Sequence, residues 1–242
     1  MIRYVRQRAL VAACALALLP GCSSEEARSE PKSVPRPPAP RAGTPAPELG
    51  RTLLDFLRAA EMGDVPVLWR ALSPPTRESF GPTLPAFRRG ALPELRKGPG
   101  VLARTARVIF ARRVTPRWGV AAVGGERSVD GELEAYAYAA VFGGGRIELD
   151  GLVLAGLDPD PLDETGAAPR VRVDVSAGAE VEEVLLWLDG RPLAVRKRTD
   201  APFSARVHAQ APRLGPGRHD LVAFATAGKT AGAIAWTFSV RP

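Results

Sequence analysis

Cysteine and histidine are scarce in this chain of 242 residues, which contains two of each. The cysteines are Cys14 and Cys22, too few for the disulfide framework of a small secreted domain or for a cysteine-rich metal site. The histidines, His208 and His219, fall on separate expected strands with no matching carboxylate pattern, so a zinc site is not expected. A chain without such cross-links must be stabilised by its hydrophobic cores.

Long hydrophobic runs are lacking as well. The apolar stretch Ala9 to Leu19 follows a segment with three arginines, and as a helix it would rise only about 16 Å, against a hydrocarbon core of roughly 30 Å. A basic segment followed by a short apolar one is typical of a signal peptide rather than of a permanent membrane span.

The residues Leu19 to Cys22, Leu-Pro-Gly-Cys, resemble the bacterial lipobox, in which an aliphatic residue and two small residues precede a cysteine that receives lipid. Pro20 departs from the pattern, which usually has Ala or Ser there. The rival match, Val11 to Cys14, would leave an apolar segment too short to act as a signal. The resemblance implies that Cys22 becomes the first residue of the mature lipoprotein and carries diacylglycerol and an amide-linked acyl chain such as palmitate. The alternative is an ordinary secretory signal with an incidental cysteine.

A lipobox also implies a location and a partner. The mature protein would be held through Cys22 on the extracytoplasmic side of a bacterial membrane. There an envelope protein or an anionic wall polymer is an expected partner, and nucleic acid is not. Cys14 would leave with the signal, so no disulfide could form. The formal net charge of +7 would fall to +4, because three arginines leave with it.

Residues 23–47 are rich in Ser, Glu and Arg and contain seven prolines, with almost nothing apolar enough to bury. Proline-rich chain is extended and semi-rigid at about 3.1 Å per residue, so this segment can hold the rest of the chain up to about 75 Å from a bilayer. We therefore expect a signal peptide over 1–21 and a tether over 22–47.

From residue 48 the apolar residues recur at helical spacing, which predicts an amphipathic helix as far as Ala60. Gly63 suits its left-handed end, and Asp64 can cap a second helix from Val65 to Leu72. Shorter helical segments are expected up to Leu95.

Beyond Gly100 the period changes towards two, which predicts strands. They are expected at 104–115, 118–123, 132–142 and 146–154, with turns at Gly124-Gly125 and at Gly143 to Gly145. Helices followed by a strand meander predict an α+β domain, with the helices on one face of a curved antiparallel sheet.

A family resemblance supports this expectation. The segment Phe56 to Asp64, followed by Leu68-Trp69 and Leu72 to Pro74, resembles the opening helices of NTF2-like (SnoaL-like, cystatin-like) domains. The expected strands 135–142 and 146–152 resemble their closing hairpin. The resemblance covers 48–157 and implies a cone whose mouth binds small molecules in some members of the family. Other members have only a structural or spacing role.

Catalysis is not expected in 48–157, because it contains no histidine and no cysteine, and enzymes of the family usually carry histidine and acidic residues in the pocket. Asp55, Asp64 or Glu134 could act as a base only if buried. Asp55 is instead expected on a solvated helix face and Asp64 as a helix cap. An apolar ligand pocket, if present, would lie among the aromatic residues Trp69, Trp118, Tyr136 and Tyr138.

Charge is distributed unevenly along the chain. The stretch 77–117 has ten basic and two acidic residues, and the stretch 126–164 has ten acidic and two basic residues. Because these charges cancel, basic and acidic strands are expected to lie side by side and to pair across the sheet. The alternative is a cationic face toward anionic lipid head groups or wall polymers.

Residues 158–169, DPDPLDETGAAP, are expected to form an acidic linker. They include weak calcium candidates, Asp158, Asp160, Asp163 and Glu164, because calcium takes carboxylate oxygens. The spacing fits no EF-hand, since Leu162 falls where that loop needs an oxygen ligand. A solvated acidic turn without metal is therefore expected.

The last region, 170–242, alternates throughout, and its five runs of period two predict the strands of a β-sandwich. The runs begin near Val171, Val184, Phe203, Leu221 and Ile234. The segments Trp187 to Pro192, Ala201 to Ser204 and Leu214 to His219, with Trp236 and Phe238 on the last strand, resemble bacterial Ig-like domains of the disulfide-free kind.

Together these features predict a lipid-anchored envelope protein that acts as a binding or spacing module, without catalysis and without a cofactor. The alternative is an NTF2-like cone that binds a small apolar ligand, and an enzyme is the third choice.

Overall fold

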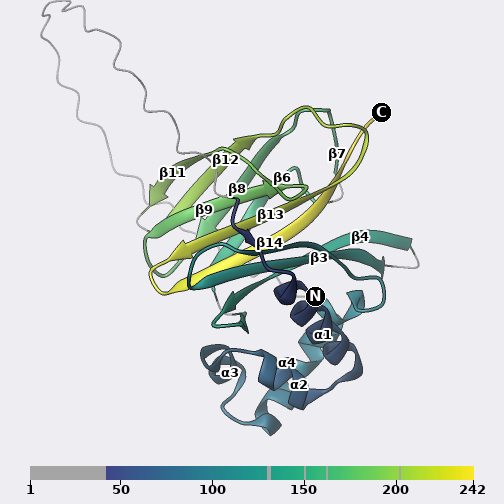
Figure 1. Ribbon diagram of the computed structural model, residues 1–242, viewed down its shortest axis with the longest axis vertical. Coiled ribbons are helices and arrows are strands. Elements are labelled where there is room, and N and C mark those ends of the chain that lie inside the picture. The colour runs from purple at the N-terminus through teal and green to yellow at the C-terminus, as the bar shows by residue number, and fades with distance from the viewer. Residues whose placement is uncertain (1–41, 130–131, 150, 162, 202) are drawn as a thin grey trace, which may run out of the picture.

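The computed structural model describes residues 42–242 except 130–131, 150, 162 and 202. The expected signal peptide, Cys22 and most of the expected tether lie outside the described residues. The described chain is mostly strand with a few helices, and its elements stack in layers, with helices at one end, then one sheet, then a pair of sheets (Figure 1). None of the helices that the structure describes is both long and apolar enough to cross a bilayer.

The helices begin and end at capping residues that are visible in the sequence. Helix α1 (Pro47–Met62) ends at Gly63, whose φ of 76° is left-handed, as expected. The Asp64 carboxylate accepts a hydrogen bond from the Val67 amide and caps α2 (Val65–Ala71). Ser73 and Thr83 cap the next two helices, α3 (Pro74–Phe80) and α4 (Leu84–Lys97), and the short 3-10 helix η1 (Pro99–Leu102) follows.

The first sheet is antiparallel and has the strand order β1-β2-β3-β4-β5. Its strands are β1 (Thr44–Pro45), β2 (Arg107–Arg113), β3 (Trp118–Val129), β4 (Glu132–Gly143) and β5 (Arg146–Glu148). The helices cover one face of this sheet, where Phe56 and Phe87 from the helices share a core with Phe142 of β4. Helices therefore pack on one face of an antiparallel sheet.

One expected turn is wrong. The sequence predicts a turn at Gly124-Gly125, but β3 continues through both residues. A Cβ atom at Gly125 would lie 2.8 Å from the Thr105 hydroxyl and 3.3 Å from the Ala106 amide nitrogen. Glycine is required because the chain leading into β2 approaches the backbone of β3 closely, and not because the chain reverses.

The other two sheets form a β-sandwich, with strand orders β11-β12-β8-β6 and β10-β9-β13-β14-β7. Their strands are β6 (Val153–Asp158), β7 (Glu164–Thr165), β8 (Arg170–Ser176), β9 (Val181–Leu188), β10 (Arg191–Pro192), β11 (Val195–Ala201), β12 (Ser204–Gln210), β13 (Gly217–Ala227) and β14 (Thr230–Val240). Valines of β8 pack against Leu186, Trp236 and Phe238 in the core between the two sheets. A strand is present at each of the five expected runs, and β11 is an additional strand whose charged sequence hid it.

The chain passes from the first sheet to the sandwich near Gly151, earlier than expected. The expected strand 146–154 is in fact two strands in different sheets, since β5 pairs with β4 and β6 pairs with β8. The expected linker 158–169 contains β7, which pairs with β14. At Gly151 the chain lies so close to β14 that a Cβ atom would overlap the carbonyl oxygen of Ala231. This close crossing fixes the two parts against each other.

A third core joins the first sheet to the sandwich. On β3, Trp118, Val120 and Ala122 point away from the helices and pack in one cluster with Val222 and Phe224 of β13. The remaining buried members of the cluster are Phe110, Ala137, Ala139, Val141, Trp187, Ala231 and Ala235. Strands β3, β4 and β13 therefore each contribute buried residues to two cores, one on either face.

Candidate functional site

Three of the four aromatic residues expected to surround a ligand pack on the helix side of the first sheet, and the fourth does not. Trp69 packs edge-on against Phe87, with ring centroids 5.4 Å apart, and Tyr136 and Tyr138 face the same helix-side core. Trp118 points to the opposite face of the sheet and belongs to the core shared with the sandwich. Successive strand residues alternate between faces, so these side chains cannot line one pocket. Burial raises the pKa of the Tyr138 phenol, and Tyr136 adds a smaller effect in the same direction.

The three carboxylates considered as bases have structural partners. Asp55 is exposed and lies 3.4 Å from Arg58, and Asp64 caps α2, both as expected. Glu134 forms an ion pair of 3.2 Å with Arg127, whose guanidinium stacks 4.4 Å from the centre of the Tyr136 ring.

The calcium candidates do not converge on a common point. Asp158 lies opposite Arg172 across the β6–β8 pair, and Glu164 forms an ion pair of 3.2 Å with Arg241. The Asp163 amide donates a hydrogen bond to the Asp160 carbonyl oxygen. Within the described ranges, no group of three or more potential metal ligands is gathered in one place.

The expected pairing of the basic stretch 77–117 with the acidic stretch 126–164 is not made. Among the described residues, no ion pair joins the two stretches. Arg104 and Arg113 instead reach carboxylates of α1, Glu61 and Glu48 respectively. The expectation failed because the partners of β2 within its sheet are β1 and β3, whose facing residues are uncharged.

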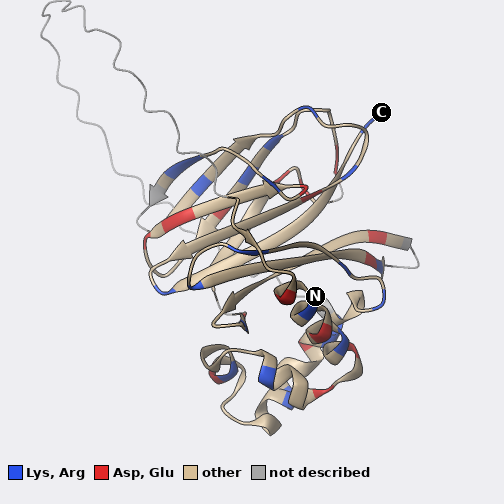
Figure 2. Ribbon diagram, viewed as in Figure 1, with Lys and Arg blue, Asp and Glu red and all other residues tan. Residues whose placement is uncertain are grey.

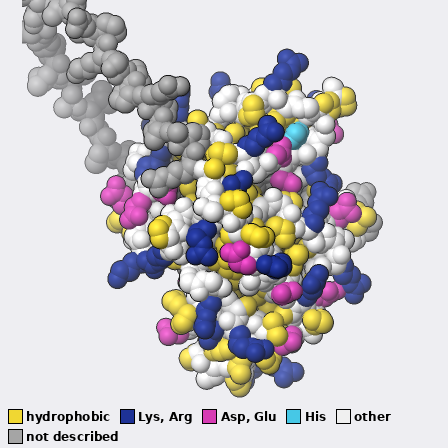
Figure 3. All heavy atoms as spheres, in the orientation of Figure 1, with side chains coloured by type: hydrophobic (Ala, Val, Ile, Leu, Met, Phe, Trp, Pro, Cys, Tyr) yellow, Lys and Arg dark blue, Asp and Glu magenta, His cyan; other side chains and the backbone are white. Residues whose placement is uncertain are grey.

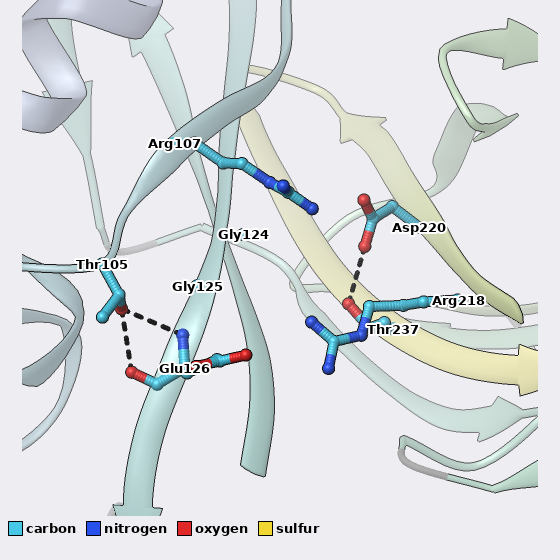
Figure 4. A pocket seen from close by; sticks show the side chains of 8 residues that line it. All are labelled: Thr105, Arg107, Gly124, Gly125, Glu126, Arg218, Asp220 and Thr237. Atoms are coloured by element: carbon cyan, nitrogen blue, oxygen red, sulfur yellow. Dashed lines mark hydrogen bonds between the residues drawn. The ribbon is translucent and has the colours of Figure 1, made fainter. Parts of the chain in front are cut away.

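A polar hollow of about 150 Å³ lies at the border of the shared core between β2–β3 and β13–β14 (Figure 4). Its lining residues are Thr105, Arg107, Gly124, Gly125, Glu126, Arg218, Asp220 and Thr237. Figure 4 shows the Arg107 side chain extending from β2 into the space in front of Asp220 and Thr237.

Two hydroxyl groups fix the walls of the hollow. The Thr105 hydroxyl donates to the Glu126 carbonyl oxygen and accepts from the Glu126 amide, both at 2.9 Å, so it closes the start of β2 onto β3. The Thr237 hydroxyl donates to the Asp220 carboxylate at 2.7 Å across the β13–β14 pair. Both hydroxyls are thus held in structural hydrogen bonds.

His219 lies next to this wall, on the opposite face of β13. Its ring nitrogens lie 2.8 Å from a carboxylate oxygen of Asp189 and 2.9 Å from the carbonyl oxygen of Gly215. Both partners only accept hydrogen bonds, so the arrangement is fully satisfied only when both nitrogens carry protons. Burial alone lowers the pKa of His219, but the hydrogen bonds to Asp189 and Gly215 and the nearby charge of Asp220 outweigh it, so the pKa is raised.

The hollow offers charge for binding rather than a catalytic group. Arg107 and Arg218 are exposed, and neither guanidinium forms a hydrogen bond or ion pair with another described residue. Two guanidinium groups on opposite walls can hold a small anion. Sequence reasoning missed this site, although Arg218 and Asp220 continue the period of Val222 and Phe224 and so had to share their face.

Comparisons with known proteins identify no family. No protein-family model and no curated protein matches the chain. Among solved structures, CopC from Methylosinus trichosporium OB3b is 19% identical over 38% of this chain and 94% of its own, with a TM-score of 0.30. PcoC, a methionine-rich copper resistance protein from Escherichia coli, is 18% identical over 38% of this chain and 99% of its own, with a TM-score of 0.27. The titin Ig tandem A164-A165 is 6% identical over 51% of this chain and 87% of its own, with a TM-score of 0.26. At such scores these likenesses support no conclusion about function.

Proposed function

We propose that the chain is a lipid-anchored protein of the bacterial envelope that works by binding or spacing rather than by catalysis. The observation that carries this proposal is the core shared by the first sheet and the sandwich, in which Trp187 and Phe224 are fully buried. Inter-domain motion is the default unless the interface is large and hydrophobic, as it is here. Because this core joins the first sheet to the sandwich, the helices and the outer sheet of the sandwich stay at a fixed distance from each other.

The finer fold assignment belongs to the same proposal. An NTF2-like unit would comprise α1 to β5, and an Ig-like unit β6 to β14. The first is supported by helices packed on one face of a five-stranded antiparallel sheet, and the second by two packed sheets with Trp236 and Phe238 in their core. An open ligand cone is not favoured, because Phe87 and Phe142 fill the space between the helices and the sheet.

The anchor is tested by expressing the full chain in a bacterium fed with an alkyne-labelled palmitate. We expect the wild type and a Cys14→Ala variant to carry label and to appear in the membrane fraction. A Cys22→Ala variant should lose the label, because it has no thiol at the lipobox to accept lipid. Mass spectrometry showing an uncleaved amino terminus or an unmodified Cys22 thiol would show that the chain is not a lipoprotein.

The spacer role is tested by limited proteolysis of the chain from residue 23 onward, which retains every described residue. We expect cleavage in 23–47 and protection of the crossing near Gly151. A Phe224→Asp variant, which places a charge in the shared core, should expose that crossing. If the wild type is cut near Gly151 as fast as in 23–47, the two parts move independently and the rigid spacer is excluded.

A second candidate, binding of a small anion in the polar hollow, is favoured by one observation, the two guanidinium groups without partners among the described residues. Inorganic phosphate or citrate should then raise the melting temperature of the wild type but not of an Arg107→Gln/Arg218→Gln variant. The matched control is Arg88→Gln/Arg89→Gln on α4, which removes the same charge. An equal shift in all three proteins would exclude the site.

A further inference from the structure

The outer face of the sheet β11-β12-β8-β6 is strongly basic. Alternate residues of β8, β11 and β12 point away from the sandwich core, and five of them are arginines: Arg170, Arg172, Arg196, Arg198 and Arg206. The acidic residues with described side chains on this face are Asp174 and Asp158. Among the described side chains of this face, arginines therefore outnumber acids by five to two. We call this surface the basic face.

The strand register concentrates these charges. Arg196, His208 and Arg172 lie directly opposite one another in one row across three strands. In the next row, Arg198 lies opposite Arg206, which forms an ion pair of 3.0 Å with Asp174. Like charges directly opposite each other destabilise a sheet. Asp158, opposite Arg172, and Asp174, paired with Arg206, offset part of this repulsion, and an anionic partner would offset more of it.

Charge elsewhere on the molecule is more mixed. Figure 2 shows basic segments on neighbouring strands of this outer sheet, whereas both signs occur along the helices and along β3 and β4. The space-filling view likewise shows acidic and basic side chains interspersed over the lower part of the molecule (Figure 3). The basic face is thus a local feature of the outermost layer.

Exposed apolar side chains lie at one end of the basic face. Val153 of β6 lies opposite Ser176 of β8, which in turn lies opposite Ser204 of β12. Val153 is 62% exposed, and Phe203, directly before Ser204, is 53% exposed. Basic residues beside exposed apolar ones match the interfacial layer of a membrane, where cations meet phosphates and apolar groups enter the acyl boundary. A phosphate polymer has no apolar region that the Phe203 side chain could contact.

The start of the described chain lies beside the sandwich. The Arg112 guanidinium donates to the carbonyl oxygen of Gly43 and to that of Gly190, in the β9–β10 turn. The described chain therefore begins next to the sandwich edge. The expected tether, which must end before β1 at Thr44, can bring the basic face to the membrane that holds the anchor, and the anchor raises its local concentration there.

We propose that the basic face is a membrane-docking surface that binds anionic phospholipid head groups. Guanidinium groups bind phosphate in a bidentate manner, and Phe203 and Val153 enter the interfacial layer at the edge of the face. This proposal rests on the proposed function and extends it by naming the surface that contacts the bilayer. In that orientation the helices point away from the membrane.

The test uses the chain from residue 23 onward, which has no lipid, so its outcome is independent of Cys22. Sedimentation with vesicles of phosphatidylcholine containing 30% phosphatidylglycerol should show binding that weakens with salt, and vesicles of phosphatidylcholine alone should show none. Each arginine near an anionic surface contributes about fivefold in affinity, so Arg170→Gln/Arg196→Gln should bind roughly 25-fold more weakly. The single variants should each lose about fivefold, which keeps the test decisive if the double variant does not fold.

Two matched controls distinguish binding through the basic face from an effect of the total charge or the total exposed apolar surface of the protein. Arg88→Gln/Arg89→Gln removes two charges from α4, and Met62→Ser removes an exposed apolar residue from the end of α1; both should bind as the wild type does. Phe203→Ser should weaken binding. The proposal is overturned if the charge variants of the two surfaces lose affinity equally, or if no anionic vesicle is bound. Binding of free polyphosphate, but not of vesicles, would also overturn it and would assign the face to a polymer.

Discussion

The imidazole of His219 and the carboxylate of Asp189 lie 2.8 Å apart and connect β13 to the β9–β10 turn. Asp189 has a left-handed φ of 48°, and its second carboxylate oxygen accepts a hydrogen bond from the Asp220 amide. His219 in turn reaches the Gly215 carbonyl oxygen. One ion pair thus fixes a strained turn and the loop that precedes β13.

This pair predicts a pH-dependent stability. The pKa of His219 is raised in the folded state, so its contribution is fully present below the unfolded value near 6.5 and is lost as pH rises through the folded pKa. The free energy of unfolding in urea should therefore fall as pH rises above about 6.5. A His219→Gln variant should lose this component of the slope. His208→Gln, which removes the other histidine, should keep it and also assigns the remaining imidazole signal in an NMR titration. A folded pKa at or below the unfolded value would contradict the predicted direction.

The core between the first sheet and the sandwich should contribute strongly to the stability of the chain. Phe224 is fully buried there, so Phe224→Ala should lower the free energy of unfolding by about 3–5 kcal/mol. Phe203 is 53% exposed, and Phe203→Ala should change stability by no more than about 0.5 kcal/mol. Urea titrations followed by circular dichroism measure both values. Similar losses in the two variants would mean that the shared core does not stabilise the fold.

The buried tryptophans Trp187 and Trp236 differ in one hydrogen bond. Trp236 Nε1 donates to the Pro159 carbonyl oxygen at 3.0 Å, whereas Trp187 Nε1 is buried without a partner among the described residues. Replacement by phenylalanine removes the same volume in both cases, but only in Trp236→Phe is a carbonyl group left unsatisfied. We expect Trp236→Phe to cost about 1–3 kcal/mol more than Trp187→Phe in the free energy of unfolding. Equal costs would show that the bond to Pro159 contributes nothing.

A buried polar cluster attaches α3 to β5. The Ser73 and Thr76 hydroxyls both donate to Glu148, at 2.5 and 3.3 Å, and Thr76 also accepts from the Leu149 amide. Glu148→Ala removes the acceptor from two buried hydroxyl groups and should cost about 1–3 kcal/mol.

The same variant should speed hydrogen exchange of the α3 amides, because the Ser73 cap loses its anchor on β5. Glu94→Ala, on the exposed side of α4, is the matched control and should leave both quantities within the range of an ordinary surface change, about 0.5 kcal/mol. Unchanged exchange in α3 would show that the cap alone holds the helix.

Local structure could be predicted from particular residues. Gly63 and Asp64 mark the boundary between α1 and α2. Gly63 can adopt the left-handed conformation that ends α1, and the Asp64 carboxylate accepts a hydrogen bond from a free amide at the start of α2, so both effects involve only neighbouring residues. The period of two in 170–242 located five strands for the same reason, since alternation depends only on the strand itself. The strand β11 was missed because its charges concealed the pattern.

The candidate sites show the limit of such inference. Trp69 and Trp118 have the same chemistry, and nothing in the sequence placed them on opposite faces of one sheet. Arg107 and Arg218 are more than a hundred positions apart and share a hollow only because β2–β3 pack against β13–β14. The basic face depends in the same way on the register that places Arg196 beside His208 and Arg172.

The sequence by itself determined the helix caps and most of the strands, because these follow from interactions within a few residues. Only the tertiary structure decided which sheet each strand joins and which apolar faces meet. A strand that is apolar on both faces must bury both of them, but the hydrophobic effect does not specify which surfaces come into contact. The packing of the whole chain therefore selects the partner of each face. That choice moved the crossing to Gly151 and joined the two expected domains through one core.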